Sequence, residues 1–331
     1  MKEAAIIGWT GNGSLDDLAR TALAKLPEKR AELTRATRSL MVQGMDPILV
    51  ARRLARMPGT AWIAVGYGFD DLAQCLSRLG SLATRYLETG GSFKVSAEVE
   101  QSGKQEGDIL MEATSTVLKA VKGTHIDEKN PEVWFRVIMF RGKGACGVQL
   151  REGQGGVPTT RRLKAACLVS GGYHGAVTAW MAALAGFSLT LVHAREDDES
   201  LRQVARLYAE LSQRMDPSSL RLLVLEGNGP PGDRIAAWLD GAEGEVFTGV
   251  HPECRGTRSM GLLRRYRAAQ FPLLLLQERE VRSRLDELGL RTKVSDREAA
   301  LRMSGRKGRF SERTFAGGEV DQNAVLDSIL G

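Results

Sequence analysis

The clearest chemical signal in this sequence is a short glycine-rich run between an apolar segment and an alanine-rich one. It reads Ser170-Gly171-Gly172-Tyr173-His174-Gly175. Glycines let the backbone turn tightly, and the N–H groups and dipole at a helix start can bind phosphate or pyrophosphate. A tight strand–helix turn without a ligand fits the run equally well. It is not a Walker motif, because no Gly-Lys-Ser/Thr follows, and it lacks the G-x-G-x-x-G spacing.

Other chemically active residues follow nearby apolar segments. In a doubly wound sheet, ligands bind outside the carboxyl ends of the strands. His193 follows the second expected strand, and Thr248, Gly249 and His251 follow the fourth. Histidines there suit phosphate recognition or acid–base chemistry, although for His193 we favour a chance placement in a polar loop.

The loop after the fourth expected strand also contains a cysteine among arginines. Neighbouring arginines would lower the pKa of the Cys254 thiol toward a reactive thiolate, while an inert thiol is favoured about two to one. The candidate catalytic residues are Cys254 and His174. The same loop concentrates basic residues that suit contacts with a nucleic-acid backbone or form a solvated helix face. These are Arg255, Arg258, Arg264, Arg265 and Arg267.

The elements of the second half predict an α/β domain with a doubly wound parallel sheet, because near-continuous apolar strands alternate with helices. The expected strands are 165–169, 187–192, 220–225, 245–250 and 273–276. The expected helices are 176–185, 199–215, 233–239, one within 259–269, and 281–288. The polar, basic tail from 291 onward indicates disorder or loose packing, with a short helix at 324–330.

The first half predicts smaller α+β modules. It opens with a strand at 4–9, a helix at 15–40 that could be broken at Pro27, a helix at 47–57, a strand at 61–66 and a helix at 70–87. A strand at 93–100, a helix at 108–121 and two strands at 133–140 and 145–150 follow, the last two joined by a glycine-containing hairpin turn.

Bulk properties exclude several classes of protein. The chain has 331 residues and a net charge of +6, which is compatible with a polyanionic partner. Residues 165–194 carry no charge, but their glycines and histidines argue against a membrane span. No signal peptide is visible. The four cysteines are far apart, so we expect a reducing cytoplasm, no disulfide framework and no zinc ribbon; the sequence singles out no metal ligands.

Several motifs in this order resemble the tRNA 4-thiouridine synthases (tRNA sulfurtransferases), which join a ferredoxin-like N-terminal domain, a THUMP domain and a PP-loop ATP pyrophosphatase domain. They are Arg56-Met57-Pro58-Gly59, Phe93-Lys94-Val95, Asn130-Pro131-x-Val133, Gly153-x-Gly155-Gly156-Val157-Pro158, Ser170-Gly171-Gly172 and Thr248-Gly249. The resemblance covers about residues 45–290. It implies a ferredoxin-like domain at 1–80, a THUMP domain at 81–160, a PP-loop-like domain at 161–290 and a tail at 291–331, without a rhodanese domain.

The resemblance also implies ligands. ATP, with Mg²⁺, would bind at the loop, where it would adenylate a uridine oxygen before sulfur replaces it. The cofactor-binding candidates are Ser170, Gly171, Gly172, Tyr173, Gly175, His193, Thr248 and Gly249. The first two domains would bind tRNA. Further RNA-binding candidates are Lys94, Lys104, Arg141, Lys143, Arg161 and Arg162. A sulfur donor or modification enzyme would be a protein partner; the oligomeric state stays open, a homodimer included.

The sequence departs from the family at the loop itself. The family reads Ser-Gly-Gly-x-Asp-Ser, whereas His174 and Gly175 stand at the last two positions here, and Val250 replaces the Glu after Thr248-Gly249. The leading interpretation is therefore a tRNA-binding THUMP protein whose pyrophosphatase chemistry is weakened or lost. The alternatives are an active ATP-dependent sulfurtransferase with Cys254 as sulfur carrier, and a nucleotide-binding or sensing protein.

Overall fold

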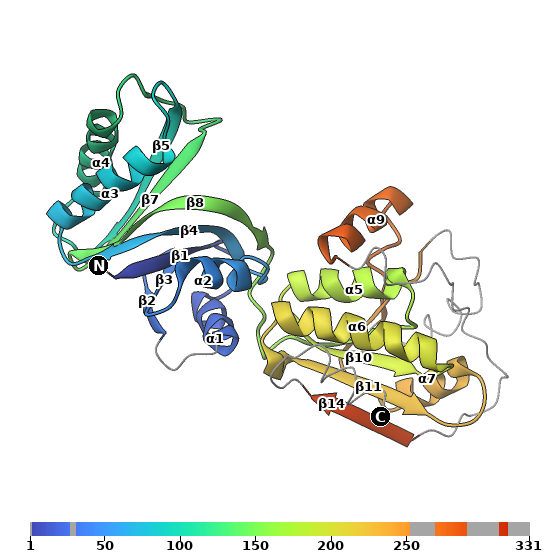
Figure 1. Cartoon of the computed structure of the whole chain (residues 1–331). Helices are drawn as coiled ribbons and strands as arrows, with labels where there is room; N and C mark the ends of the chain where they lie inside the picture. Colours follow the sequence, from blue (N-terminus) through green and yellow to red (C-terminus); the bar gives the residue numbers. More distant parts are fainter. Residues whose placement is uncertain (1, 27–30, 252–268, 290–310, 317–331) are drawn as a thin grey trace. The chain divides into compact units, whose positions relative to one another are not determined.

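The computed structural model describes residues 2–26, 31–251, 269–289 and 311–316. The chain divides into two compact units, Met1–Pro158 and Thr159–Gly331, each with its own sheet (Figure 1). Within the described residues, no helix is both long enough and apolar enough to cross a membrane. The two units are described separately below.

Among its described residues, the first unit contains four helices and one continuous sheet of eight strands. In chain order the elements are β1 (Glu3–Trp9), α1 (Leu15–Lys25), β2 (Glu32–Arg35), β3 (Ser39–Gln43), α2 (Pro47–Leu54), β4 (Thr60–Phe69), α3 (Leu72–Tyr86), β5 (Ser92–Glu100), α4 (Glu106–Ala120), β6 (His125–Ile126), β7 (Val133–Phe140) and β8 (Lys143–Gly155). The strand order is β2-β3-β1-β4-β8-β7-β5-β6, so the expected ferredoxin-like and THUMP segments share one sheet. Their division near residue 80 stays a prediction.

All four helices cover the same face of this sheet, because alternate residues of β4 reach both helix pairs. Ile63 and Val65 pack in the core under α1 and α2. Tyr67 and Phe69, on the same face of the strand, pack in the core under α3 and α4. The opposite face carries a small apolar cluster that includes Ala64 and no helix among the described residues.

The sheet curls so strongly that its flanks meet across the helix-free face. The carboxylate of Glu98 on β5 accepts hydrogen bonds from the Arg38 backbone N–H and the Ser39 hydroxyl, at 2.5 and 2.9 Å. Four strands separate β5 from β3 in the sheet order, so this contact requires a curved, barrel-like sheet. Met41 and Ile138 consequently share the apolar cluster inside the curve.

The predicted helix at 15–40 is wrong in its second half. α1 ends at Lys25, and Glu32–Arg35 and Ser39–Gln43 are strands. β3 lies between β1 and β2, where Leu40 pairs with Ile7 and Val42 pairs with Ala5. β3 is paired on both edges and its apolar side chains are buried, which favours the strand conformation. This tertiary pairing overrides the local helix propensity of the segment.

The second unit is built on a six-stranded sheet with the order β13-β12-β9-β10-β11-β14. Its elements are β9 (Lys164–Leu168), α5 (Tyr173–Leu184), β10 (Ser188–Ala194), α6 (Asp198–Arg214), a 3-10 turn (Pro217–Ser219), β11 (Leu220–Glu226), α7 (Pro231–Leu239), β12 (Glu245–Thr248), β13 (Ala269–Gln270), α9 (Glu278–Glu287) and β14 (Ser311–Ala316). The first five strands are parallel, with one core on each face. One core contains residues of α5, α6 and α9 and the other contains α7, which confirms the predicted doubly wound α/β fold.

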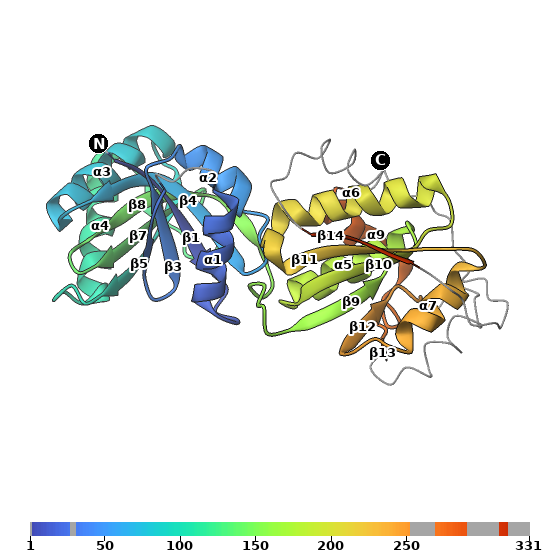
Figure 2. The same cartoon turned by 90° about the horizontal axis from the view of Figure 1, so that it is seen from below.

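Two expectations for the end of this unit are wrong. The predicted fifth strand, 273–276, is a turn, and β13 ends at Gln270. Pro272 lacks a backbone N–H and cannot continue a ladder, so Leu274 and Leu276 instead close i→i+3 turns. Ser311–Ala316, in the tail expected to be disordered or loosely packed, pairs antiparallel with β11 along six residues (Figure 2). This strand covers an otherwise open sheet edge. The helices expected within 259–269 and at 324–330 fall mainly or wholly outside the described residues.

A buried arginine joins α6 to the end of α9. Arg214 is 1% exposed and stacks over the Trp180 ring at 5.1 Å. Its guanidinium donates to Glu210 Oε1 at 2.6 Å and to the carbonyls of Glu287 and Leu288 at 3.1 and 3.0 Å. It therefore satisfies carbonyls that a helix end leaves without intrahelical partners.

We expect Arg214→Ala to destabilise the second unit by about 3–5 kcal/mol, because it leaves the partly buried Glu210 carboxylate and two helix-end carbonyls without this donor. Urea unfolding followed by hydrogen exchange in α6 and α9 measures the effect. Glu210→Gln keeps an acceptor for Arg214 and should cost far less. Equal losses in both variants would contradict this assignment.

Candidate functional site

The glycine-rich loop connects β9 to α5 at the carboxyl edge of the second sheet. Ser170 is exposed, and Gly171 has a φ of +87°, where a Cβ would lie 3.0 Å from the Ser200 carbonyl oxygen. Gly172 is the N-cap of α5 and makes no side-chain cap bond. Because no side chain caps this helix start, its backbone N–H groups and partial positive charge suit an anion.

A second loop presses directly against the start of α5. A Cβ at Gly249, which follows β12, would lie 2.6 Å from Gly175 N and from the His174 carbonyl carbon. Gly175 is also tightly placed, since its Cβ would lie 3.3 Å from Val169 Cα. The structure thus brings the Ser170–Gly175 loop together with Thr248 and Gly249, which lie far away in the sequence.

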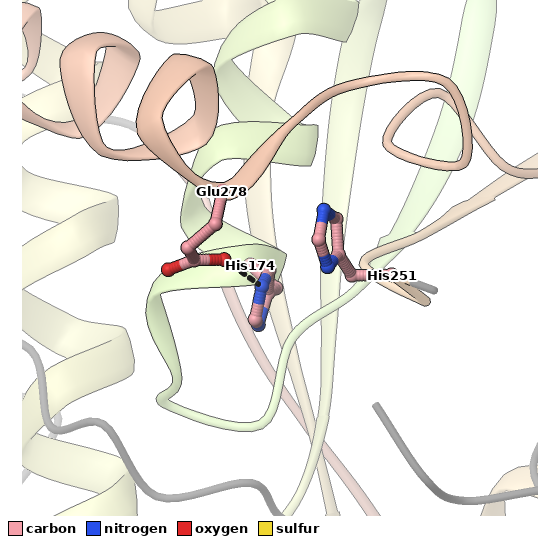
Figure 3. Close-up of side chains that lie close together, drawn as sticks. All are labelled: His174, His251 and Glu278. Atoms are coloured by element: carbon pink, nitrogen blue, oxygen red, sulfur yellow. Dashed lines mark ion pairs between the residues drawn. The ribbon is translucent and has the colours of Figure 1, made fainter. Parts of the chain in front are cut away.

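His174, His251 and Glu278 gather where these loops meet the start of α9 (Figure 3), and Tyr173 joins them through a hydrogen bond. His174 and His251 stack with their ring centroids 5.0 Å apart. His174 Nε2 lies 3.4 Å from Glu278 Oε2, and the Tyr173 hydroxyl donates to Glu278 Oε1 at 2.5 Å. His251 is 2% exposed, and its Nε2 lies 2.9 Å from the Leu276 carbonyl oxygen.

Glu278 is held as a carboxylate. Burial raises the pKa of this carboxyl, but hydrogen bonds from Tyr173 and Arg282 and the charge of His174 outweigh burial and lower it below its usual value. Glu278 therefore places a negative charge beside the start of α5 at neutral pH. In the resembled motif, an Asp on the loop itself would supply a carboxylate there.

His193 is buried behind the glycine-rich loop, which it contacts through the Val169 carbonyl, and it is not placed to touch a ligand. It lies within β10 rather than after it, is 1% exposed, and its Nδ1 lies 2.9 Å from the Val169 carbonyl oxygen. Burial lowers its pKa to about 4, and the nearby Arg234 guanidinium contributes to the shift. His193 is thus a neutral group that positions the residue preceding Ser170.

Some basic residues expected to bind RNA gather in the first unit around a cavity of about 640 Å³. Arg141 and Lys143 come from the turn between β7 and β8, which Arg141 and Gly142 make with positive φ values. Lys2 and Arg78 line the same cavity, with Asp70 as an acidic neighbour. Lys143 Nζ is 3.8 Å from Asp70 and its side chain is 71% exposed.

The other described candidates lie apart from this cavity. Lys94 Nζ is 2.9 Å from Glu128 and 4.8 Å from the centre of the Trp134 ring. Lys104 pairs with Glu112 at 3.3 Å. Arg161, in the second unit, donates to Ser218, and Arg162 is exposed. Cys254, Arg255, Arg258, Arg264, Arg265 and Arg267 lie outside the described residues.

The sequence did not single out several residues that the structure places at these sites. Glu278 begins a helix with a Gln277–Glu280 capping box, a signal for a helix start but not for proximity to a distant loop. Lys2 precedes β1 and Arg78 lies on α3, so only the tertiary structure shows that both line one cavity.

Gly249→Ala should destabilise the second unit by about 1–3 kcal/mol or more, because the added methyl group would overlap the first turn of α5. Thermal unfolding measures the loss. Gly241→Ala is a matched control, since a Cβ there has its nearest neighbour at 3.9 Å. An unchanged melting temperature in Gly249→Ala would refute the close approach.

His193 should make the free energy of unfolding of the second unit depend on pH below neutrality. Its pKa is lowered from 6.5 to about 4 in the folded state, so the neutral form contributes stability above pH 6.5 that is lost as pH falls toward 4. The full effect is about 3 kcal/mol. Denaturant unfolding at several pH values should give a shallower dependence for His193→Gln than for the wild type. Parallel curves would contradict the assignment; His125→Gln, on exposed β6, is the control.

Comparison with solved structures identifies the fold. No family model and no curated protein sequence matches the chain. PH1313 from Pyrococcus horikoshii Ot3 matches 88% of this chain and all of its own, with 18% identity and a TM-score of 0.70. A 4-thiouridine synthetase, solved as an RNA complex with bound ATP, matches 88% of this chain and 86% of its own, with 16% identity and a TM-score of 0.67. The chain therefore has the fold of the 4-thiouridine synthetases, as the resemblance predicted.

Proposed function

We propose that this protein binds tRNA in the cytoplasm and presents it to a separate modification enzyme or sulfur donor. Its second unit would keep the PP-loop-like fold with weakened or absent ATP pyrophosphatase chemistry. One combined observation carries the proposal. The chain shares the fold of a synthetase solved with RNA, but His174, which contacts Glu278, stands where the resembled loop has an Asp.

The charge around the first-unit cavity supports RNA binding. Lys2, Arg78, Arg141 and Lys143 surround it, against one carboxylate from Asp70. Basic side chains that gain phosphate partners release counterions, which makes binding favourable and salt-dependent. Such a cavity, open and partly apolar, suits an unpaired segment of RNA with its phosphates on the basic rim.

The second-unit loop supports the loss of pyrophosphate cleavage. Mg²⁺ prefers oxygen ligands in near-octahedral geometry, whereas the position beside α5 holds two stacked imidazoles. The nearby carboxylate of Glu278 already accepts hydrogen bonds from Tyr173 and Arg282. A nucleotide phosphate would rely on Ser170 and the backbone N–H groups at the start of α5.

Filter-binding titrations of full-length protein with tRNA test the RNA half of the proposal. Arg141→Ala/Lys143→Ala should weaken binding and reduce the salt slope of log K by about 2. Lys119→Ala/Lys122→Ala removes the same charge from exposed positions near the end of α4 and should leave the slope unchanged. Equal effects of the two double variants, or no tRNA binding by the wild type at low salt, would overturn this half.

Release of AMP and pyrophosphate tests the second part of the proposal, the loss of pyrophosphatase chemistry. With tRNA and Mg²⁺-ATP present, we expect no AMP or pyrophosphate release above the level without protein. Release that depends on tRNA and is lost in Ser170→Ala would overturn this half and favour an active sulfurtransferase.

A further inference from the structure

We propose that His174, His251 and Glu278 form a binding site for a borderline divalent transition-metal ion, with Zn²⁺ as the representative. Their ligand atoms all lie within 4.8 Å of one another (Figure 3). The three residues come from the first turn of α5, the segment after β12 and the first turn of α9. The site goes beyond RNA binding and does not depend on it.

The distances suit a metal of this class after small side-chain movements. A tetrahedral ion with bonds of about 2.0–2.1 Å separates neighbouring ligand atoms by about 3.3 Å. His174 Nε2 and Glu278 Oε2 are already 3.4 Å apart. Zn²⁺ readily accepts two imidazoles and a carboxylate, whereas Mg²⁺ prefers oxygen ligands to the two imidazole nitrogens.

Hydrogen bonds around the cluster point the correct atoms inward. The Leu276 carbonyl can only accept, so a neutral His251 donates its Nε2–H there and carries its lone pair on Nδ1. The Tyr173 hydroxyl and Arg282 both donate to Glu278 Oε1, which leaves Oε2 directed at His174. Such outer partners fix the tautomer and orientation of metal ligands.

Partial burial of the cluster also fits an open metal site. The side chains of His174 and Glu278 are 15% and 22% exposed, while His251 is almost fully buried. Three protein ligands leave a fourth tetrahedral position for water or an anion. The uncapped start of α5 lies beside that position, since His174 belongs to its first turn.

Metal competition against a chromophoric chelator tests the proposal on metal-stripped, full-length protein. Wild type should bind one equivalent of Zn²⁺, and excess Mg²⁺ should not displace it. His251→Gln and Glu278→Gln should each weaken binding by more than about 100-fold, because loss of an outer partner alone costs about 10–100-fold. Both substitutions retain groups that can form the hydrogen bonds to Leu276, Tyr173 and Arg282, so circular dichroism should show folded variants.

A matched control removes a histidine from elsewhere. His125→Gln, on exposed β6 of the first unit, should bind Zn²⁺ like the wild type, and Zn²⁺ should raise the melting temperature of both proteins but not of Glu278→Gln. The Co²⁺ derivative should show visible d–d bands without a thiolate charge-transfer band. Unchanged Zn²⁺ affinity in the cluster variants, equal loss in His125→Gln, or a thiolate band would each overturn the proposal.

Discussion

The geometry of the second unit depends on how closely two pieces of backbone approach at the carboxyl edge of its sheet. Gly249 leaves no room for a side chain beside His174 and Gly175. That contact places the segment containing His251 against the first turn of α5. α9 completes the arrangement because Arg214 anchors its far end and Glu278 meets the histidines at its start. The close approach at Gly249 and the anchor at Arg214 together assemble groups from three distant parts of the chain.

Curvature has the corresponding role in the first unit. Eight strands with helices on one face could form an open, gently twisted sheet, but Glu98 holds the flanks together across the other face. The register of β1, β4 and β8 places the turn between β7 and β8 near the first residues of the chain, while the curve brings Met41 and Ile138 into the wall of one cavity that basic side chains line. The modest positive net charge of the chain is thereby concentrated around this cavity.

A single change of residue type in the glycine-rich loop alters what its surroundings can do. An aspartate at position 174 would add negative charge where a helix start favours it. His174 instead needs a partner, and Glu278 supplies one from another helix. Where an aspartate would offer oxygen ligands suited to Mg²⁺, the site therefore offers two imidazoles beside the carboxylate of Glu278. The proposed loss of pyrophosphate chemistry and the proposed metal site both rest on this exchange.

The sequence by itself determined the doubly wound fold, the position of the glycine-rich loop and the β7–β8 hairpin. Each depends on patterns within a few residues, such as apolar runs, glycines and helix periodicity. Tertiary structure decided that Glu32–Arg35 and Ser39–Gln43 form strands and that Ser311–Ala316 closes the sheet edge. It also decided that Glu278 meets His174, because contacts between residues so far apart leave no periodic trace in the chain. The sequence states which chemical groups the side chains carry. Which of these groups contact one another depends on how the backbone packs.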